Sequence, residues 1–135
     1  MVSKSDNVEH YVLMTNNLFT PEKVDGTVYI EVNNSKIRNI YFVRPSFDTK
    51  VLDFTDFIVA PGFIDVHIHG YGGHDASEGT EEAIAVMAKG LASKGVTAFL
   101  PTTVAAPMSD LQNILKVSAK FDSIEGARPL GFHLE

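Results

Sequence analysis

Two histidines and an aspartate alternate along one short apolar stretch, and their types and spacing are suited to chemistry. Asp65, His67 and His69 are separated by single apolar residues, Val66 and Ile68. Alternate side chains of an extended strand share a face, so these three point the same way. Two imidazoles and a carboxylate are costly to bury side by side unless they are hydrogen-bonded or hold a metal ion. The pattern therefore indicates either a metal site, for zinc, iron or nickel, or a set of hydrogen-bonded core histidines.

A second pair of polar residues ends the sequence, where His133 and Glu135 are separated by Leu134. In an extended strand His133 and Glu135 share a face, and Leu134 points to the other. A carboxylate at the end of a buried strand is costly unless it is paired or coordinates a cation. On the residues alone, Glu135 is either a ligand for an ion shared with His69 or a solvated glutamate with no role in chemistry.

Three apolar strands, separated by two amphipathic helices, are predicted to position these residues. The strands are expected at residues 63–68, 96–100 and 129–135, and the first is expected to be buried. The helices are expected to start at Thr80 and at Ser109. This alternation predicts right-handed β/α units on a parallel sheet, the start of a barrel. Residues at the C-terminal ends of barrel strands meet on one face, so the histidines and Glu135 are expected there.

Both helices carry boundary signals. Thr80 is a favourable N-cap, two glutamates follow it, and Lys94 and Gly95 are typical of a helix end. Ser109 and Gln112 predict a capping box at the start of the second helix. Apolar stripes at helical spacing are expected to be buried in both, namely Ile84, Met87, Ala88, Leu91 and Ala92, then Leu111, Ile114, Leu115 and Phe121.

Two further residues lie where a barrel would place its catalytic face. His74 belongs to a glycine-rich loop at residues 70–79, and Thr102 ends the second predicted strand. Each is a weak candidate for substrate binding. His74 is alternatively a solvated loop histidine, and the hydroxyls of Thr102 and Thr103 alternatively bond to nearby backbone. The loop lacks the lysine and Ser/Thr of a phosphate-cradling P-loop.

Residues 1–60 have few helix signals and are predicted to form a small all-β unit. A turn cluster at residues 33–36 predicts a hairpin between two of its strands. The expected strands lie at residues 11–14, 26–32, 37–43, 51–54 and 57–59. No catalytic residue is expected in this part, which we interpret as structural.

Composition excludes several classes of protein. The 135 residues are 44% hydrophobic and 21% charged, which is a globular balance, and no apolar run is long enough to span a membrane. The net charge of −6 argues against a nucleic-acid surface. The sequence has no cysteine for disulfides or thiolate ligands, and its first residues are polar, so no secretory signal is expected. We expect a cytoplasmic protein with no nucleic-acid or membrane partner.

The sequence resembles a known group of enzymes. Residues 61–70 resemble the first barrel strand of the amidohydrolase superfamily, and residues 67–75, 97–103 and 131–135 resemble the N-acetylglucosamine-6-phosphate deacetylase family in order and spacing. The resemblance implies an α/β protein: a metal-dependent hydrolase (β/α)₈ TIM barrel with a small β-sandwich domain. A barrel takes about 250 residues. The expected division is thus an incomplete β-sandwich-like domain at 1–60 and the first three barrel strands at 61–135, the N-terminal portion of a longer enzyme.

The resemblance also implies roles for residues. In the deacetylase family the glutamate of the His-Leu-Glu motif, here Glu135, is a metal ligand in every metal arrangement. His67 and His69 match the two histidines that bind a second metal in members that have both. The implied cofactor is zinc or iron, one or two ions. The aspartate that acts as general acid and base would lie beyond Glu135, so no catalytic residue is expected in this chain.

The implied reaction is metal-dependent hydrolysis of the N-acetyl group of N-acetylglucosamine 6-phosphate, giving glucosamine 6-phosphate and acetate. The implied partner is this small amino-sugar phosphate, and full-length members of the family are commonly homodimers. The chain by itself is expected to be inactive and prone to self-association, because three strands leave an open sheet edge. The alternatives are another amidohydrolase, such as a dihydroorotase- or hydantoinase-like cyclic amidase or a deaminase, or a barrel fragment without catalysis.

Overall fold

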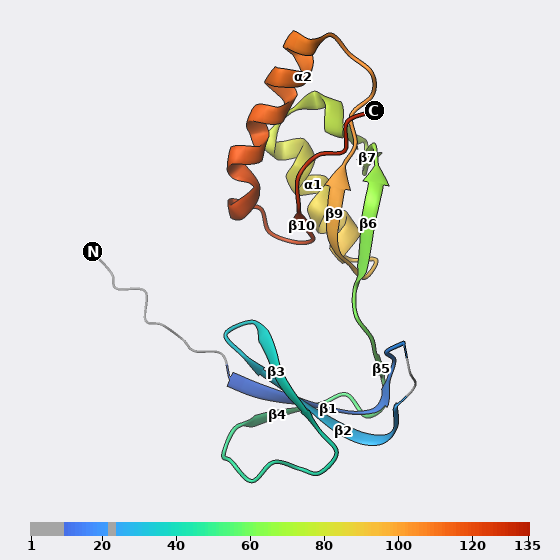
Figure 1. The fold of residues 1–135 in the computed structure, drawn as a ribbon, viewed down its shortest axis with the longest axis vertical. Helices are drawn as coiled ribbons and strands as arrows, with labels where there is room; N and C mark the ends of the chain where they lie inside the picture. Colours follow the sequence, from blue (N-terminus) through green and yellow to red (C-terminus); the bar gives the residue numbers. More distant parts are fainter. Residues whose placement is uncertain (1–9, 22–23) are drawn as a thin grey trace, which may run out of the picture. The chain divides into compact units, whose positions relative to one another are not determined.

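A computed structural model describes residues 10–21 and 24–135 (Figure 1). Contacts divide the chain into two compact units, Met1–Pro61 and Gly62–Glu135. The described residues of the first unit form strands and turns, whereas strands alternate with helices in the second, so the fold is mixed α/β. No helix in the described ranges is both long and apolar enough to cross a membrane.

The first unit is a five-stranded sheet around β1 (His10–Leu18). β2 (Val24–Asn33) pairs antiparallel with β1 and with β3 (Lys36–Tyr41). β4 (Lys50–Asp53) and β5 (Ile58–Val59) pair parallel with β1.

The predicted hairpin is confirmed by the pairing of β2 with β3. Its two-residue turn, Asn34 and Ser35, has positive φ at both positions, 52° and 57°. Such a turn has the twist that a hairpin needs, and asparagine tolerates the left-handed conformation. The core of this unit is one face of alternating residues, to which β2 contributes Val28, Ile30 and Val32.

The second unit contains the parallel sheet that the sequence predicts. Its strand order is β10 (Arg128–Pro129), β9 (Val96–Pro101), β6 (Phe63–Ile68), with β9 parallel to both neighbours. The helix α1 (Glu81–Ala92) links β6 to β9. The helix α2 (Met108–Leu115) and the 3₁₀ helix η2 (Lys116–Ser123) link β9 to β10.

The predicted loop after β6 is partly ordered into secondary structure. It contains the two-stranded hairpin of β7 (Gly70–Tyr71) and β8 (His74–Asp75), followed by the 3₁₀ helix η1 (Ala76–Glu78).

One apolar core joins these elements of the second unit. α1 contributes Ile84, Met87, Ala88 and Leu91, β9 contributes Phe99 and η2 contributes Val117. The predicted N-cap is confirmed, because the Thr80 hydroxyl accepts a bond from the Ala83 N–H at 3.2 Å. Ala92 was expected in the buried stripe but is exposed, because it ends the last turn of α1.

The predicted capping box of the second helix is wrong. α2 begins at Met108, its N-cap is Pro107, and no side chain caps it. The fixed φ of a proline, here −54°, allows a helix to start directly after it. Ser109 therefore lies inside the first turn, where its hydroxyl donates to the Asp110 carboxylate at 3.3 Å.

The predicted third strand is mostly irregular. β10 ends at Pro129, and the only later pairing within the described chain is one bridge between Thr102 and His133. Gly131 interrupts the strand with φ 153°. The segment nevertheless runs beside β9, because the backbone N–H groups of Leu130 and His133 donate to Phe99 and Pro101.

The expectation that β6 is buried is also wrong. Phe63, Ile64 and Val66 are 73%, 61% and 59% exposed. β6 lies at one edge of a sheet of three strands, so no further strand among the described residues covers its outer side.

Candidate metal centre

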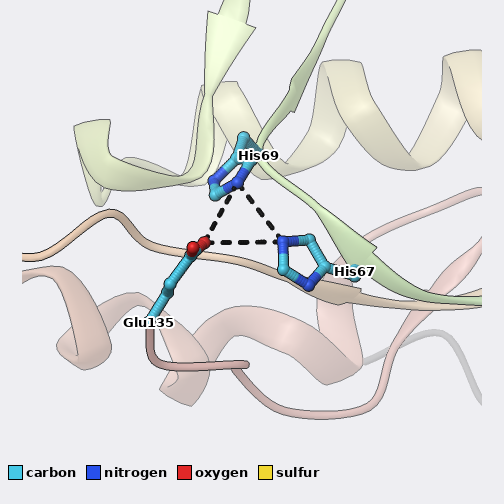
Figure 2. Close-up of side chains that lie close together, drawn as sticks. All are labelled: His67, His69 and Glu135. Carbon is cyan, nitrogen blue, oxygen red and sulfur yellow. Dashed lines mark hydrogen bonds and ion pairs between the residues drawn. The ribbon is translucent and has the colours of Figure 1, made fainter.

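Three of the residues singled out in the sequence lie together at the ends of the parallel strands. Figure 2 shows His67 from β6, His69 just after it, and Glu135 from the last residues of the chain, with their polar atoms pointing toward one another. The two Nε2 atoms are 3.3 Å apart. Glu135 Oε2 lies 3.5 Å from Nε2 of His67 and 3.3 Å from Nε2 of His69.

A bulge in β6 shapes this cluster. The pairing of β6 with β9 shifts between Asp65 and Ile68, so β6 has one more residue than β9 over this stretch. A bulge breaks the alternation of side chains and re-aims those near it. This explains why Asp65, expected on the face of the two histidines, is not part of the cluster. Its carboxylate instead accepts from the backbone N–H of His67 at 3.1 Å.

The ring of His69 is oriented by the strand beside it. Nδ1 of His69 lies 3.2 Å from the backbone carbonyl oxygen of Thr102. Because a carbonyl can only accept, Nδ1 carries the proton in this contact. In the neutral ring Nε2 then has a free lone pair, and that atom faces His67 and Glu135.

Thr102, directly after β9, connects β6 and β9 through hydrogen bonds. Its hydroxyl accepts from the Ile68 N–H at 3.1 Å and donates to the Leu100 carbonyl at 3.2 Å, and the side chain is fully buried. The hydroxyl thus bonds to backbone, as in one of the two interpretations of the sequence. The neighbouring Thr103 is also fully buried, and its hydroxyl has no hydrogen-bond partner in the described part of the chain.

His74 lies in a separate group. Its Nδ1 is 3.2 Å from Oε2 of Glu78, whose other oxygen accepts from the Asp75 N–H at 2.7 Å. The bond from Asp75 and, to a lesser extent, the contact with His74 lower the pKa of the Glu78 carboxyl. Asp75 in turn accepts from the Ser77 N–H, completing a capping box for η1. These bonds tie the β7–β8 hairpin to η1.

His133 lies beside the cluster, in ring contact with His67. Its ring centroid lies 4.7 Å from that of His67, with the planes tilted by 53°. The sequence placed His133 on the same face as Glu135 but assigned it no role. The feature of the sequence that could have identified His133 is its position two residues before Glu135, a candidate ligand.

The geometry of the three side chains fits a metal ion. Ligands at the 2.0–2.1 Å typical of zinc–nitrogen bonds would lie about 3.3–3.4 Å apart at the corners of a tetrahedron. The three distances in the cluster are 3.3, 3.3 and 3.5 Å. Two imidazole nitrogens and a carboxylate oxygen are a donor set that suits zinc or iron. The side chains are 41% to 56% exposed, so a further ligand can approach.

A hollow of about 270 Å³ lies in the first unit, and none of its lining residues belongs to the groups described above. Apart from Thr20 its lining is apolar, with side chains such as Leu13, Ile30 and Val59. This lining has no charged side chain to bind a phosphate group, so we do not assign the hollow to a sugar phosphate.

Comparison with known proteins supports the resemblance seen in the sequence. N-acetylglucosamine-6-phosphate deacetylase of Bacillus subtilis (strain 168) is 30% identical over 125 residues, covering 87% of this chain and 32% of that protein. The mouse (Mus musculus) protein of that name is 44% identical over 82 residues, 58% of this chain and 20% of that protein. The chain thus spans about a third or less of the length of these relatives.

Two solved structures are also similar to this chain in fold. The deacetylase of Pasteurella multocida superimposes with a TM-score of 0.81 at 23% identity, covering 93% of this chain and 34% of that one. The Mycobacterium smegmatis deacetylase gives 0.74 at 25% identity, covering 93% and 35%. The amidohydrolase family profile matches residues 58–135, which is more than half of the sequence and includes all three members of the cluster. The chain therefore belongs to the amidohydrolase family.

Proposed function

We propose that this chain is part of a metal-dependent deacetylase that hydrolyses the N-acetyl group of N-acetylglucosamine 6-phosphate, giving glucosamine 6-phosphate and acetate. The relatives at 30% and 44% identity carry the name of that enzyme. A structural neighbour from Mycobacterium smegmatis, with a TM-score of 0.68, was solved in complex with N-acetyl-D-glucosamine-6-phosphate.

The fold proposed for the whole enzyme is a TIM barrel with a β-sandwich-like domain. Residues 61–135 would be its first three strands, and residues 1–60 an incomplete part of the smaller domain. The parallel order β10–β9–β6, with helices in both connections, supports the first assignment. The five-stranded sheet with no helix among its described residues supports the second.

The observation that carries the proposed function is the meeting of His67, His69 and Glu135. In the sequence Glu135 is two β/α units away from the histidines, yet its Oε2 lies within 3.5 Å of both Nε2 atoms. We propose that the three residues bind zinc or iron, as one or two ions. When bound, such an ion supplies a Lewis acid for the amide carbonyl and lowers the pKa of water towards neutrality.

The residues of this chain would hold and orient the reacting groups. His67 and His69 offer Nε2 lone pairs, and the Thr102 carbonyl keeps the proton of His69 on Nδ1. Glu135 offsets part of the positive charge of an ion. The partial exposure of all three leaves an open side for the acetamido group of the substrate. The group that moves the proton to the leaving amine is expected outside this chain.

The remaining proposals concern the setting of the enzyme. We propose a cytoplasmic homodimer that acts on a small amino-sugar phosphate and binds neither nucleic acid nor membrane. The net charge of −6 supports the absence of a nucleic-acid surface.

The test is acetate release by the natural polypeptide purified from its own cells, after its intact mass has been compared with the 14.7 kDa of this chain. Zinc or iron(II) is added, and N-acetylglucosamine 6-phosphate is compared with unphosphorylated N-acetylglucosamine. We expect metal-dependent acetate release, preferentially from the phosphorylated sugar.

Other outcomes identify the alternatives. Opening of a cyclic amide, or release of ammonia from a base, without acetate release would indicate a different amidohydrolase. Metal binding without hydrolysis by a polypeptide of 14.7 kDa would indicate a non-catalytic fragment.

A further inference from the structure

The two histidines of the cluster are held in different ways. His69 has a hydrogen bond from Nδ1 to the Thr102 carbonyl. His67 has no such bond from Nδ1 to any residue in the described part of the chain, and its side chain is 46% exposed. The His67 ring is instead bordered by two other rings, that of His69 at 5.1 Å between centroids and that of His133 at 4.7 Å.

His133 is itself well anchored. Its backbone N–H donates to the Pro101 carbonyl and its own carbonyl accepts from the Thr103 N–H, both at 3.0 Å. The preceding Phe132 packs against the apolar core, with its ring 5.5 Å from that of Phe121. His133 therefore presents its ring to His67 from a fixed backbone.

We propose that His133 is a positioning residue, which orients His67 for metal binding by ring contact. This inference rests on the proposed metal centre. The His133 ring lies 4.7 Å from the His67 ring between centroids, and this contact would limit the rotation of His67 and keep its Nε2 close to Nε2 of His69 and to Oε2 of Glu135. Ligands held in place before the ion arrives lose less rotational freedom when it binds.

The experiment measures metal binding by the 135-residue chain rather than hydrolysis. Zn²⁺ affinity is determined by calorimetry, and Co²⁺ is used as a probe because its visible spectrum reports coordination geometry. The variants are His133→Ala, His133→Phe and, as a matched control, His74→Ala, which removes a histidine that lies outside the cluster.

We expect His133→Ala to weaken Zn²⁺ binding about tenfold, at the lower end of the effects seen when partners of metal ligands are removed. The Co²⁺ spectrum of this variant should also change. His133→Phe keeps a flat ring and should bind Zn²⁺ within about twofold of the unaltered chain, since the ring contact survives. His74→Ala should leave both readouts unchanged. Circular dichroism checks that each variant folds, and His133→Leu replaces the alanine variant if that one does not.

Three results would overturn the inference. Equal Zn²⁺ affinity and an unchanged Co²⁺ spectrum in His133→Ala would show that His67 needs no support. Equal weakening in the alanine and phenylalanine variants would assign the effect to the imidazole nitrogens instead of the ring contact. If the unaltered chain binds no Zn²⁺, the metal centre itself fails, and this result is distinguishable from the other two.

Discussion

At the scale of single residues, the carboxylate of Glu135 turns a pair of neighbouring histidines into a candidate metal centre. Two imidazoles separated by one residue can also serve as ordinary hydrogen-bonding groups. A carboxylate oxygen within 3.5 Å of both Nε2 atoms supplies a third donor and a negative charge. An ion of charge +2 would replace the three separate polar contacts with direct bonds.

The first prediction concerns this carboxylate. Glu135→Gln keeps the shape of the side chain but removes its charge, and we expect Zn²⁺ affinity to fall by about a hundredfold or more, because loss of a charged ligand should cost at least as much as loss of a ligand's hydrogen-bond partner. Calorimetry on the 135-residue chain measures it. Glu125→Gln is the matched control, because Glu125 is exposed and lies outside the cluster. Unchanged affinity in Glu135→Gln would place any bound metal elsewhere.

A second prediction at this scale concerns Glu78 and pH. The bond from the Asp75 N–H, followed by the contact with His74, lowers the pKa of Glu78 below its ordinary 4.5 in the folded chain. A lowered pKa stabilises the fold above the ordinary value, and this stabilisation is lost as the pH falls through the folded pKa. The stability of the unaltered chain should therefore fall more steeply in acid than that of Glu78→Gln.

Urea unfolding between about pH 6 and pH 3 measures these slopes, over the range in which a carboxyl with a lowered pKa takes up its proton. His74→Ala should lie between the two proteins, because the bond from Asp75 remains. Equal slopes for the unaltered chain and Glu78→Gln would contradict the prediction.

At the scale of elements, the contact between β6 and β9 determines where the ligands lie. Thr102 forms two hydrogen bonds to Ile68 at the bulge in β6. Its hydroxyl accepts from the Ile68 N–H, and its own N–H donates to the Ile68 carbonyl at 2.8 Å. The Thr102 carbonyl then orients His69. Thr102, the residue directly after β9, thus links sheet pairing to the orientation of a ligand.

Thr102 and Thr103 provide a matched pair for the third prediction. Both are fully buried, but only the Thr102 hydroxyl has partners within the described residues. Thr102→Val removes the side-chain acceptor of the partly buried Ile68 N–H bond and should cost about 1–3 kcal/mol of unfolding free energy. Thr103→Val removes a hydroxyl that lacks a partner and should be neutral or stabilising.

Urea unfolding measures the unfolding free energies of the two variants, and Zn²⁺ affinity is a second readout. We expect only Thr102→Val to weaken Zn²⁺ binding, because it loosens the strand pairing that places His69. Equal loss of stability in both variants would mean that the Thr102 hydrogen bonds contribute little.

At the scale of the whole molecule, the outer side of β6 departs from an ordinary globular surface because it exposes large apolar side chains. Strands of a parallel sheet are usually apolar on both faces because other elements cover both of them. Here Phe63, Ile64 and Val66 are each more than half exposed, and β6 pairs only with β9 within the described sheet. An apolar edge strand of this kind is a template for pairing with another chain.

The fourth prediction is therefore that the 135-residue chain self-associates through β6. Sedimentation velocity should give an average mass above 14.7 kDa that rises with concentration. Ile64→Lys places a charge on the exposed strand and should lower this mass, whereas Val104→Lys, at an exposed position outside the sheet, should not. A mass of 14.7 kDa for the unaltered chain at every concentration would contradict the prediction.

Much of the second unit could be predicted because its signals are local. Thr80 caps α1 through a bond to a residue three positions away, and the apolar spacing of α1 determines which side chains enter the core. The starts of β6 and β9 follow from short apolar runs. The start of α2 was predicted wrongly because two local signals compete there, and the backbone preference of Pro107 prevails over the side chain of Ser109.

The sequence by itself determined the succession of β6, α1, β9 and α2, the turn at Asn34 and Ser35, and the residue types able to bind a metal, because these depend on neighbours along the chain. Only the tertiary structure decided which of them meet. The bulge that separates Asp65 from the two histidines, the carbonyl that orients His69 and the ring of His133 beside His67 all arise from contacts between distant segments. The exposure of β6 was decided in the same way, since burial depends on what lies beside a strand and not on its own residues.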